Sequence, residues 1–191
     1  MRILMLGNSY TFANDLPQQL AALTGAEVVH HTRGGARLAE QLNPKTKMGA
    51  RTQAALSDVA WDYVILQEMS NAPIASKEKF MQSVTKLVDL IRQNGAMPVL
   101  YATWAYECGG KQLAAFGMDY DEMALAMQTN YREAAESTGA LLAEVGKAFY
   151  ERADKEAIYA ADGSHPNEVG SSIAAEIIAQ TIQTHEAEQQ R

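Results

Sequence analysis

Short apolar runs alternate with longer amphipathic segments along the 191 residues of the chain. The apolar runs are rich in β-branched and aromatic side chains and stop at polar or glycine residues, which is typical of buried strands. They predict strands at residues 2–6, 27–32, 61–67, 97–103 and 140–144. The longer segments carry apolar residues at helical spacing and predict helices at residues 15–24, 48–59, 76–94, 121–138 and 167–185.

Residues at the ends of these segments agree with the predicted helix boundaries. Pro17 lies near a first turn, where its missing N–H leaves no hydrogen bond unmade, and Ser76 stands at the cap position of the longest amphipathic segment. Gly25, Gly95 and Gly139 each follow the last residue of a predicted helix, where a left-handed backbone favours glycine.

Strands that alternate with helices of a dozen or more residues predict parallel pairing through right-handed crossovers. Helices then cover both faces of the sheet, and continuous apolar strands fit that burial on two sides. We therefore predict an α/β fold, a single three-layer α/β/α domain with about five parallel strands. The domain is expected to span residues 1–185, followed by a polar C-terminal tail at residues 186–191.

Composition argues against several classes of partner. The chain has 16 Lys and Arg against 23 Asp and Glu, a net charge of -7, and its basic residues are scattered, so we expect no nucleic acid partner. Its apolar runs are far shorter than the roughly 20 residues needed to cross a bilayer, so we expect no membrane contact. Gly7 and Asn8 end the first apolar run too early for a secretion signal, and the fold is expected to start at Met1. Cys108 is the only cysteine, which excludes an internal disulfide and fits a cytoplasmic protein.

Polar stretches follow the predicted strands at residues 7–10, 33–35, 67–71 and 104–107. In a parallel sheet the loops at the carboxyl ends of the strands line one rim, where ligands bind. A further polar loop at residues 161–167 precedes the last helix and could fold back to this rim. We expect the chemistry of the protein to lie there.

Asp162 and His165 are three residues apart in a turn that Gly163 and Pro166 favour. A carboxylate beside an imidazole can orient it and stabilise its charged form, and the imidazole can act as a base. The missing nucleophile is predicted to be Ser9, which follows the first strand in an exposed turn.

These stretches resemble, in order, the motif blocks of the SGNH (GDSL-type) hydrolase superfamily. The matching blocks are Gly-Asn-Ser-Tyr after the first strand, a glycine pair after the second, a polar cluster after the third and Asp-x-x-His before the last helix. The resemblance covers nearly the whole chain. It implies a flavodoxin-like fold and a carboxylic ester hydrolase, with Ser9, His165 and Asp162 as a catalytic triad.

Two positions depart from the superfamily pattern. Asn8 replaces the usual Asp before the nucleophile, and the third block reads Gln-Glu-Met-Ser-Asn instead of Gly-x-Asn-Asp. That block is more similar to the one found in sialate and xylan acetyl esterases of the superfamily. The backbone N–H groups of Ser9 and Gly35 and the side chain of Gln67 are expected to form the oxyanion hole, with Asn71 in reserve for Gln67.

The resemblance implies a small-molecule ester as substrate, and a short acyl chain such as acetyl, carried by a carbohydrate, is the first expectation. Trp104 and Tyr106 follow the fourth strand and are predicted to line the sugar or acyl pocket, although they could equally pack against neighbouring loops. Water releases the acid in such a mechanism, so no cofactor is expected, and no metal site either. The oligomeric state is not predicted.

Structural interpretations of the same residues stay open. Ser9 alone could be a turn or helix-capping residue, the Gly34-Gly35 pair a sharp strand exit, and Gln67 a partner for buried backbone groups. A different class of protein is also open, because a polar turn before a helix could make this a non-catalytic flavodoxin-like module that binds phosphate, flavin or carbohydrate. Asp162 and His165 discriminate, since a phosphate site has no need of them.

Overall fold

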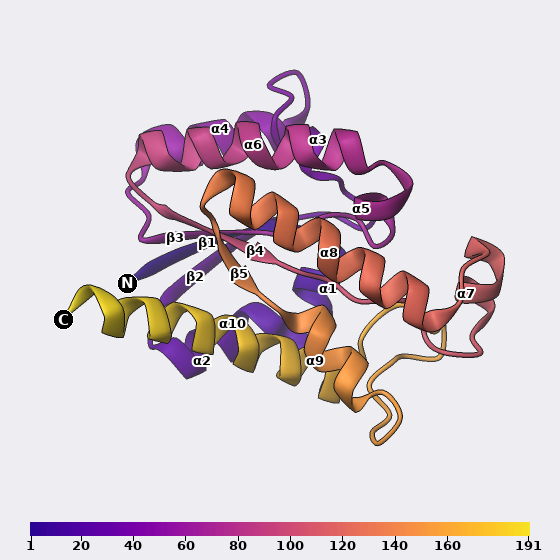
Figure 1. Cartoon of the computed structure of the whole chain (residues 1–191). Coiled ribbons are helices and arrows are strands. Elements are labelled where there is room, and N and C mark those ends of the chain that lie inside the picture. The colour runs from indigo at the N-terminus through magenta and orange to yellow at the C-terminus, as the bar shows by residue number, and fades with distance from the viewer.

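The five predicted strands form one parallel sheet in the computed structural model, which describes residues 1–191 (Figure 1). The strands are β1 (Arg2–Gly7), β2 (Glu27–Thr32), β3 (Tyr63–Leu66), β4 (Met97–Tyr101) and β5 (Leu141–Ala143). Their order across the sheet is β2-β1-β3-β4-β5, and every neighbouring pair is parallel. The predicted α/β class, with a flavodoxin-like sheet, is confirmed.

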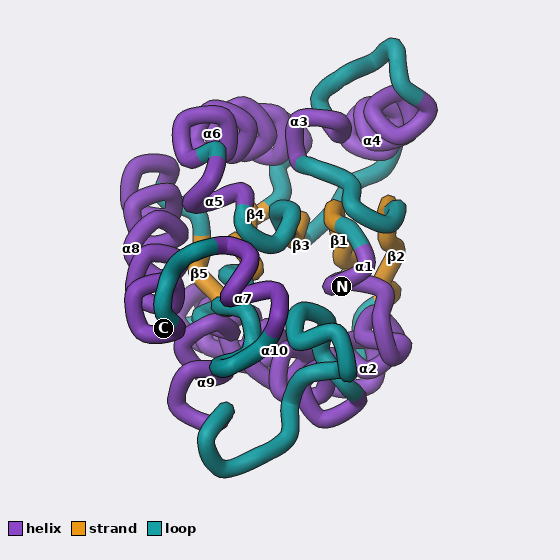
Figure 2. Tube along the Cα trace, turned by 90° about the vertical axis from the view of Figure 1, so that its right-hand side faces the viewer, coloured by secondary structure: helices purple, strands orange, loops and turns teal.

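Helices cover both faces of this sheet. The long ones are α2 (Leu16–Thr24), α4 (Lys47–Asp58), α6 (Lys77–Asn94), α8 (Tyr120–Thr138), α9 (Val145–Arg152) and α10 (Glu168–Gln189). The short ones are α1 (Ser9–Phe12), the 3₁₀ turn η1 (Ala13–Asp15), α3 (Leu38–Gln41), α5 (Ala72–Ala75) and α7 (Lys111–Phe116). In Figure 2, α3, α4 and α6 lie above the row of strands, and α2, α9 and α10 lie below it. The buried side chains of α8 pack in the same core as those of α6. The three layers follow from this arrangement.

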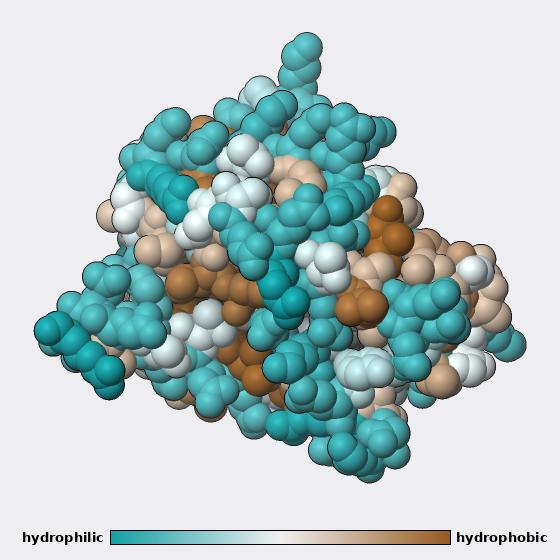
Figure 3. Space-filling model, viewed as in Figure 1, coloured by the Kyte–Doolittle hydropathy of each residue, from teal (hydrophilic) through white to brown (hydrophobic).

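Alternate residues of each central strand enter two separate cores. Leu4 and Leu6 of β1 pack with the α6 and α8 face, whereas Ile3 and Met5 pack with the α2 and α10 face. All four side chains are fully buried, which explains why β1 has a continuous apolar run instead of an apolar–polar alternation. The face of the molecule in Figure 3 is mainly hydrophilic, with hydrophobic residues in small separate groups.

The strand order reverses between β1 and β3. The connection after β1 goes to β2 on one side of it, and the later strands are added on the other side. At such a switch point the loops that leave the two strands diverge and open a crevice at the carboxyl edge of the sheet. The residues directly after β1 and β3 are therefore the ones that the topology exposes to a ligand.

The structure differs from the predicted elements mainly at short helices and at chain ends. Four-residue helices such as α1, α3 and α5 were not predicted, because they are too short to show a periodic pattern, and the eight-residue α9 was not predicted either. The last helix continues to Gln189 rather than ending at His185, through part of the expected polar tail. Its last turns are rich in Glu, Ala and Gln, which are good helix formers, and the Gln189 side chain lies 3.4 Å from the His185 ring. No helix has the length and apolar character needed to span a bilayer.

Candidate active site

Ser9 is the first residue of α1, directly after β1. The cap of this helix is Asn8, whose side-chain oxygen accepts a hydrogen bond from the backbone N–H of Tyr10 at 3.1 Å. The alternative that Ser9 is a capping residue is therefore wrong, and its hydroxyl is free for another partner. The Ser9 N–H lies in the first turn, where the helix itself provides no acceptor.

The turn that carries Ser9 is held from both neighbouring loops. The backbone N–H of Asn8 donates to Gln67 Oε1 at 2.8 Å, and its side-chain amide donates to the Ala36 carbonyl at 3.1 Å. Gly7 has no room for a side chain, since a Cβ there would lie 2.3 Å from Thr11 Oγ1 and 2.6 Å from Gln67 Oε1. Glycine is thus required because the turn that carries Ser9 packs against the loop after β3.

The loop between α9 and α10 carries the other two predicted site residues. Asp162 Oδ1 accepts hydrogen bonds from the backbone N–H groups of Ser164 and His165, at 3.0 and 2.9 Å. Gly163 between them has a φ of 68°, a left-handed conformation that glycine adopts without strain. This local turn presents the Asp162 and His165 side chains on the same side of the loop.

The structure brings Ser9, His165 and Asp162 together, although Ser9 lies at the opposite end of the chain. Ser9 Oγ lies 2.8 Å from His165 Nε2, and His165 Nδ1 lies 2.5 Å from Asp162 Oδ2. Burial alone would raise the pKa of Asp162, but hydrogen bonds from the His165 ring and from the two loop N–H groups outweigh it and keep that pKa below 3.8. The carboxylate is therefore ionised at neutral pH and can hold the Nδ1 proton of His165.

The predicted oxyanion donors have different surroundings. The N–H of Gly35 makes no hydrogen bond within the protein and the residue is exposed, as an oxyanion donor requires. The Gln67 side chain is only 1% exposed, its oxygen accepts from Asn8 and Thr11, and its amide nitrogen donates to the Glu68 carbonyl. These bonds fix Gln67 beneath the turn that carries Ser9.

Asn71, the reserve residue, has the properties that Gln67 lacks. It is partly exposed at the start of α5, and its side chain makes no hydrogen bond within the protein. The free side-chain amide after β3 is therefore that of Asn71, at the start of α5, and not that of Gln67, at the end of the strand. The sequence showed both amides, but only the fold distinguishes the one already bonded from the one available.

Trp104 does not line a pocket, contrary to expectation. It is 1% exposed and stacks between Tyr10 and Phe149, with ring centroids 4.8 and 3.9 Å apart. Its indole N–H donates to the carbonyl of Ser164 at 3.0 Å. Tyr106 is also buried, at 6% exposure. Both aromatics therefore support the catalytic rim from inside the molecule, the packing alternative noted for them.

Glu68 is a buried carboxyl group that sequence reasoning had assigned no definite role. Burial raises its pKa, although the backbone N–H groups of Met69 and Leu38 donate to its Oε1 at 2.6 and 3.3 Å and partly offset that effect. Glu68 thereby links the loop after β2 to the loop after β3. The position directly after a strong strand was the only signal for it in the sequence.

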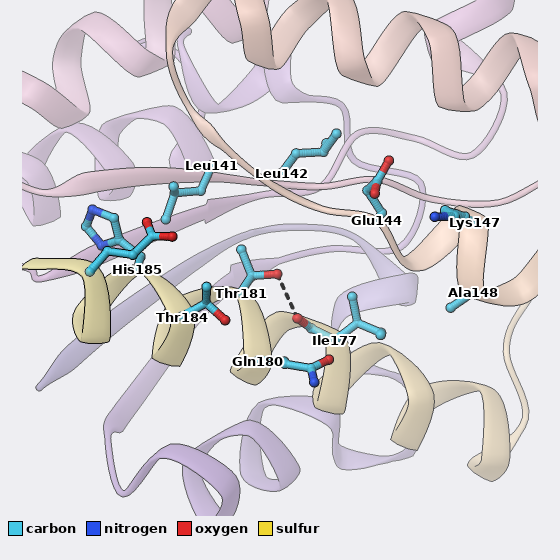
Figure 4. Close-up of a pocket in the computed structure, with 11 residues that line it drawn as sticks. Leu141, Leu142, Glu144, Lys147, Ala148, Ile177, Gln180, Thr181, Thr184 and His185 are labelled. Atoms are coloured by element: carbon cyan, nitrogen blue, oxygen red, sulfur yellow. Dashed lines mark hydrogen bonds between the residues drawn. The ribbon is translucent and has the colours of Figure 1, made fainter.

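Other features lie outside this site. A groove of about 470 Å³ runs between β5 and α10 and is lined by residues such as Leu141, Ala148, Ile177, Thr181 and His185 (Figure 4). It lies beside the edge strand β5, and none of the predicted site residues contributes to it. The chain contains no group of three or more His, Cys, Asp or Glu side chains arranged to hold a metal ion.

Solved structures with similar folds identify the family. A protein from Slackia heliotrinireducens, described as an SGNH hydrolase, is 51% identical and superposes with a TM-score of 0.92, over 95% of this chain and 98% of that one. TesA is 20% identical with a TM-score of 0.69, over 96% of this chain and 99% of that one. Axe2, an acetylxylan esterase from Geobacillus stearothermophilus, is 16% identical with a TM-score of 0.68, over 95% and 93%. No family model matches the chain, and no curated protein does.

The fold and the 51% identity over nearly the whole length of both chains define the class of protein. The chain belongs to the SGNH hydrolase superfamily, as its motif blocks indicate. It is a hydrolase of the SGNH type, the family that the sequence predicts. The two more distant structures show the same fold.

Proposed function

We propose that the protein is a serine esterase that hydrolyses short-chain carboxylic esters, with Ser9 as nucleophile, His165 as base and Asp162 as the group that orients the base. The observation that carries this proposal is the continuous contact from Ser9 Oγ to His165 Nε2 at 2.8 Å and from His165 Nδ1 to Asp162 at 2.5 Å. A hydroxyl within 2.6 to 3.2 Å of an unprotonated imidazole nitrogen meets the geometric requirement for general-base activation.

In the first half of the reaction, His165 Nε2 takes the proton of Ser9 while Ser9 Oγ attacks the ester carbonyl. Asp162 keeps the Nδ1 proton in place, so Nε2 has a free lone pair, and it stabilises the imidazolium that forms. The imidazolium then protonates the departing alcohol, which leaves an acyl group on Ser9. In the second half, His165 activates a water molecule, and the acid is released without a cofactor.

The oxyanion of the tetrahedral intermediate requires N–H donors that are not already hydrogen-bonded to other groups of the protein. We assign this role to the backbone N–H groups of Ser9 and Gly35 and to the side chain of Asn71. Each such donor is worth roughly 2.7 to 4 kcal/mol of barrier lowering in hydrolases. Gln67 is not proposed as a donor, because its amide is bonded to the nucleophile turn and to Glu68.

The substrate is proposed to carry a short acyl group, such as acetyl, on a bulky alcohol such as a carbohydrate. The Asp162 and His165 side chains are 44% and 40% exposed, so the leaving-group side of the site is open to solvent. An open site accepts alcohols of varied size. Axe2, which has the same fold, is an acetylxylan esterase, and this supports an acetylated sugar as the first substrate to test.

Turnover of p-nitrophenyl acetate tests the proposal. The wild-type enzyme should release nitrophenol, and Ser9→Ala should lower kcat more than about a thousandfold, because a triad without its nucleophile retains little activity. Ser57→Ala is the matched control, since Ser57 is an exposed serine on α4 whose hydroxyl bonds only to the Gln53 carbonyl. It should retain wild-type turnover.

Two outcomes would contradict the proposal. A wild-type protein without esterase activity would favour the non-catalytic binding module, and equal activity in Ser9→Ala would exclude Ser9 as nucleophile. The acyl preference is tested with p-nitrophenyl acetate, butyrate and octanoate, for which kcat/KM should fall with chain length. Acetate release from acetylated xylo-oligosaccharides tests the alcohol half of the substrate.

A further inference from the structure

Two pairs of hydrogen-bonded hydroxyl groups lie in the segments that carry the proposed reacting groups: Tyr10 with Ser164, and Ser70 with Tyr106. The hydroxyls of Tyr10 and Ser164 share a short hydrogen bond. The hydroxyls of Ser70 and Tyr106 share another, at 3.0 Å. Burial raises the pKa of Tyr10, and the hydrogen bond to Ser164 opposes that rise. None of these groups has a role in the proposed chemistry.

Three of these four residues are sequence neighbours of the proposed reacting groups. Tyr10 follows Ser9, and Ser164 precedes His165. Ser70 precedes Asn71, the proposed oxyanion donor. The bond between Tyr10 and Ser164 therefore joins the helix that carries Ser9 to the loop that carries His165, two segments that the sheet topology alone does not hold together.

The Tyr10–Ser164 pair is buried and closely packed. Tyr10 and Ser164 are 3% and 7% exposed, so water competes little for their hydroxyls. The Tyr10 ring stacks on Trp104 and meets the His165 ring edge-on, with centroids 5.2 Å apart and planes at 81°. Trp104 also holds the Ser164 carbonyl, so Ser164 is fixed at its side chain and at its backbone.

We propose that Tyr10 and Ser164 are positioning residues for the esterase reaction, whose hydrogen bond keeps His165 Nε2 in line with Ser9 Oγ. This inference rests on the proposed function. The exposed Asp162–His165 pair has no other side-chain bond to α1 besides the one between Ser9 and His165. That bond is broken in each catalytic cycle, when Ser9 carries the acyl group and cannot bond to His165 in the same way. The buried bond between Tyr10 and Ser164 persists and holds the histidine loop in register for deacylation.

The test is a double-mutant cycle with Tyr10→Phe and Ser164→Ala, because Tyr10→Phe keeps the stacked ring and removes only the hydroxyl. Each single variant should lower kcat on p-nitrophenyl acetate about tenfold, the effect expected for one buried hydrogen bond, with KM unchanged. The double variant should lose no more than either single one, since both changes break the same bond. The rate at which a fluorophosphonate labels Ser9 should fall by the same factor, which a purely structural role would not cause.

Tyr63→Phe is the matched control. The Tyr63 hydroxyl also bonds to a side chain, His185 Nδ1 at 2.9 Å, but it lies at the start of β3, at the opposite edge of the sheet from Ser9. This variant should retain wild-type kcat and labelling rate. If Tyr10→Phe does not fold, Ser164→Ala alone carries the prediction, as it removes one hydroxyl from the same bond.

Wild-type kcat in Tyr10→Phe or in Ser164→Ala would overturn the inference, and so would additive losses of about a hundredfold in the double variant. These results would leave the proposed function intact, because the wild type would remain active and Ser9→Ala inactive. A wild-type enzyme without turnover or labelling would instead contradict the proposed function itself.

Discussion

Asp162→Asn isolates the contribution of one oxygen atom to the site. The asparagine keeps the shape of the side chain and the Oδ1 atom that accepts from the N–H groups of Ser164 and His165. It replaces Oδ2 with an NH₂ group facing His165 Nδ1 at 2.5 Å. Two donors cannot share that bond, so His165 is driven to carry its proton on Nε2, which faces Ser9. The base then cannot accept the serine proton.

In a serine hydrolase this exchange lowers kcat about 10⁴-fold, equivalent to about 5.5 kcal/mol of barrier. Asp162 and His165 are 44% and 40% exposed, so water can solvate either tautomer and weaken the preference. We therefore expect a loss near 10³-fold for Asp162→Asn. Asp162→Ala should be the more active of the two variants, because it removes the carboxylate without placing a donor against Nδ1.

The order of stability should be the reverse of the order of activity, with Asp162→Asn more stable than Asp162→Ala. Asn keeps the two backbone hydrogen bonds of the turn, and Ala loses both, which costs about 1 kcal/mol in a partly exposed loop. The assay is kcat/KM on p-nitrophenyl acetate at pH 7 to 9, with urea unfolding in parallel. Activity of Asp162→Asn within tenfold of wild type would refute the role of Asp162, and equal stability of the Asn and Ala variants would refute the role of the turn.

Three other predictions follow from burial and bonding at the site. Asn71→Ala should lower kcat about 10²-fold to 10³-fold with little effect on urea unfolding, whereas Gln67→Ala should lower the unfolding midpoint as well; the reverse pattern would make Gln67 the oxyanion donor. Trp104→Ala should cost about 3–5 kcal/mol in the free energy of unfolding, because its ring is packed on both faces, and a loss below about 1 kcal/mol would contradict that packing. Burial raises the pKa of Glu68, so the folded state retains that proton above pH 4.5 and loses stability as the pH rises from there. Glu68→Gln should therefore flatten the stability–pH profile above pH 4.5, and an unchanged profile would contradict it.

Local patterns in the sequence were enough to predict the strands, most of the long helices and the candidate site residues. Five strands and all the long helices except α9 were predicted from periodicity and end residues, since a parallel strand buried on both faces must be continuously apolar. Asp162 and His165 could be paired from the sequence because their contact depends on one turn, built by Gly163 over three residues. The position of Ser9 directly after the first strand placed it on the same rim.

Only the tertiary structure shows which of two neighbouring side chains is already hydrogen-bonded within the protein and which is free. Gln67 and Asn71 are both amides after β3, and the sequence contains nothing that says that Asn8 and Glu68 already occupy the first. Trp104 was expected in a pocket and lies in the core, because the faces of Tyr10 and Phe149 close over both sides of its ring.

The bond between Tyr10 and Ser164 joins residues from opposite ends of the chain, and no local pattern marks either as a partner. Sequence patterns report backbone preference and burial, which are properties of short segments. The direction in which a loop side chain points depends on contacts with segments that are distant in the chain, and these exist only once the sheet has brought them together.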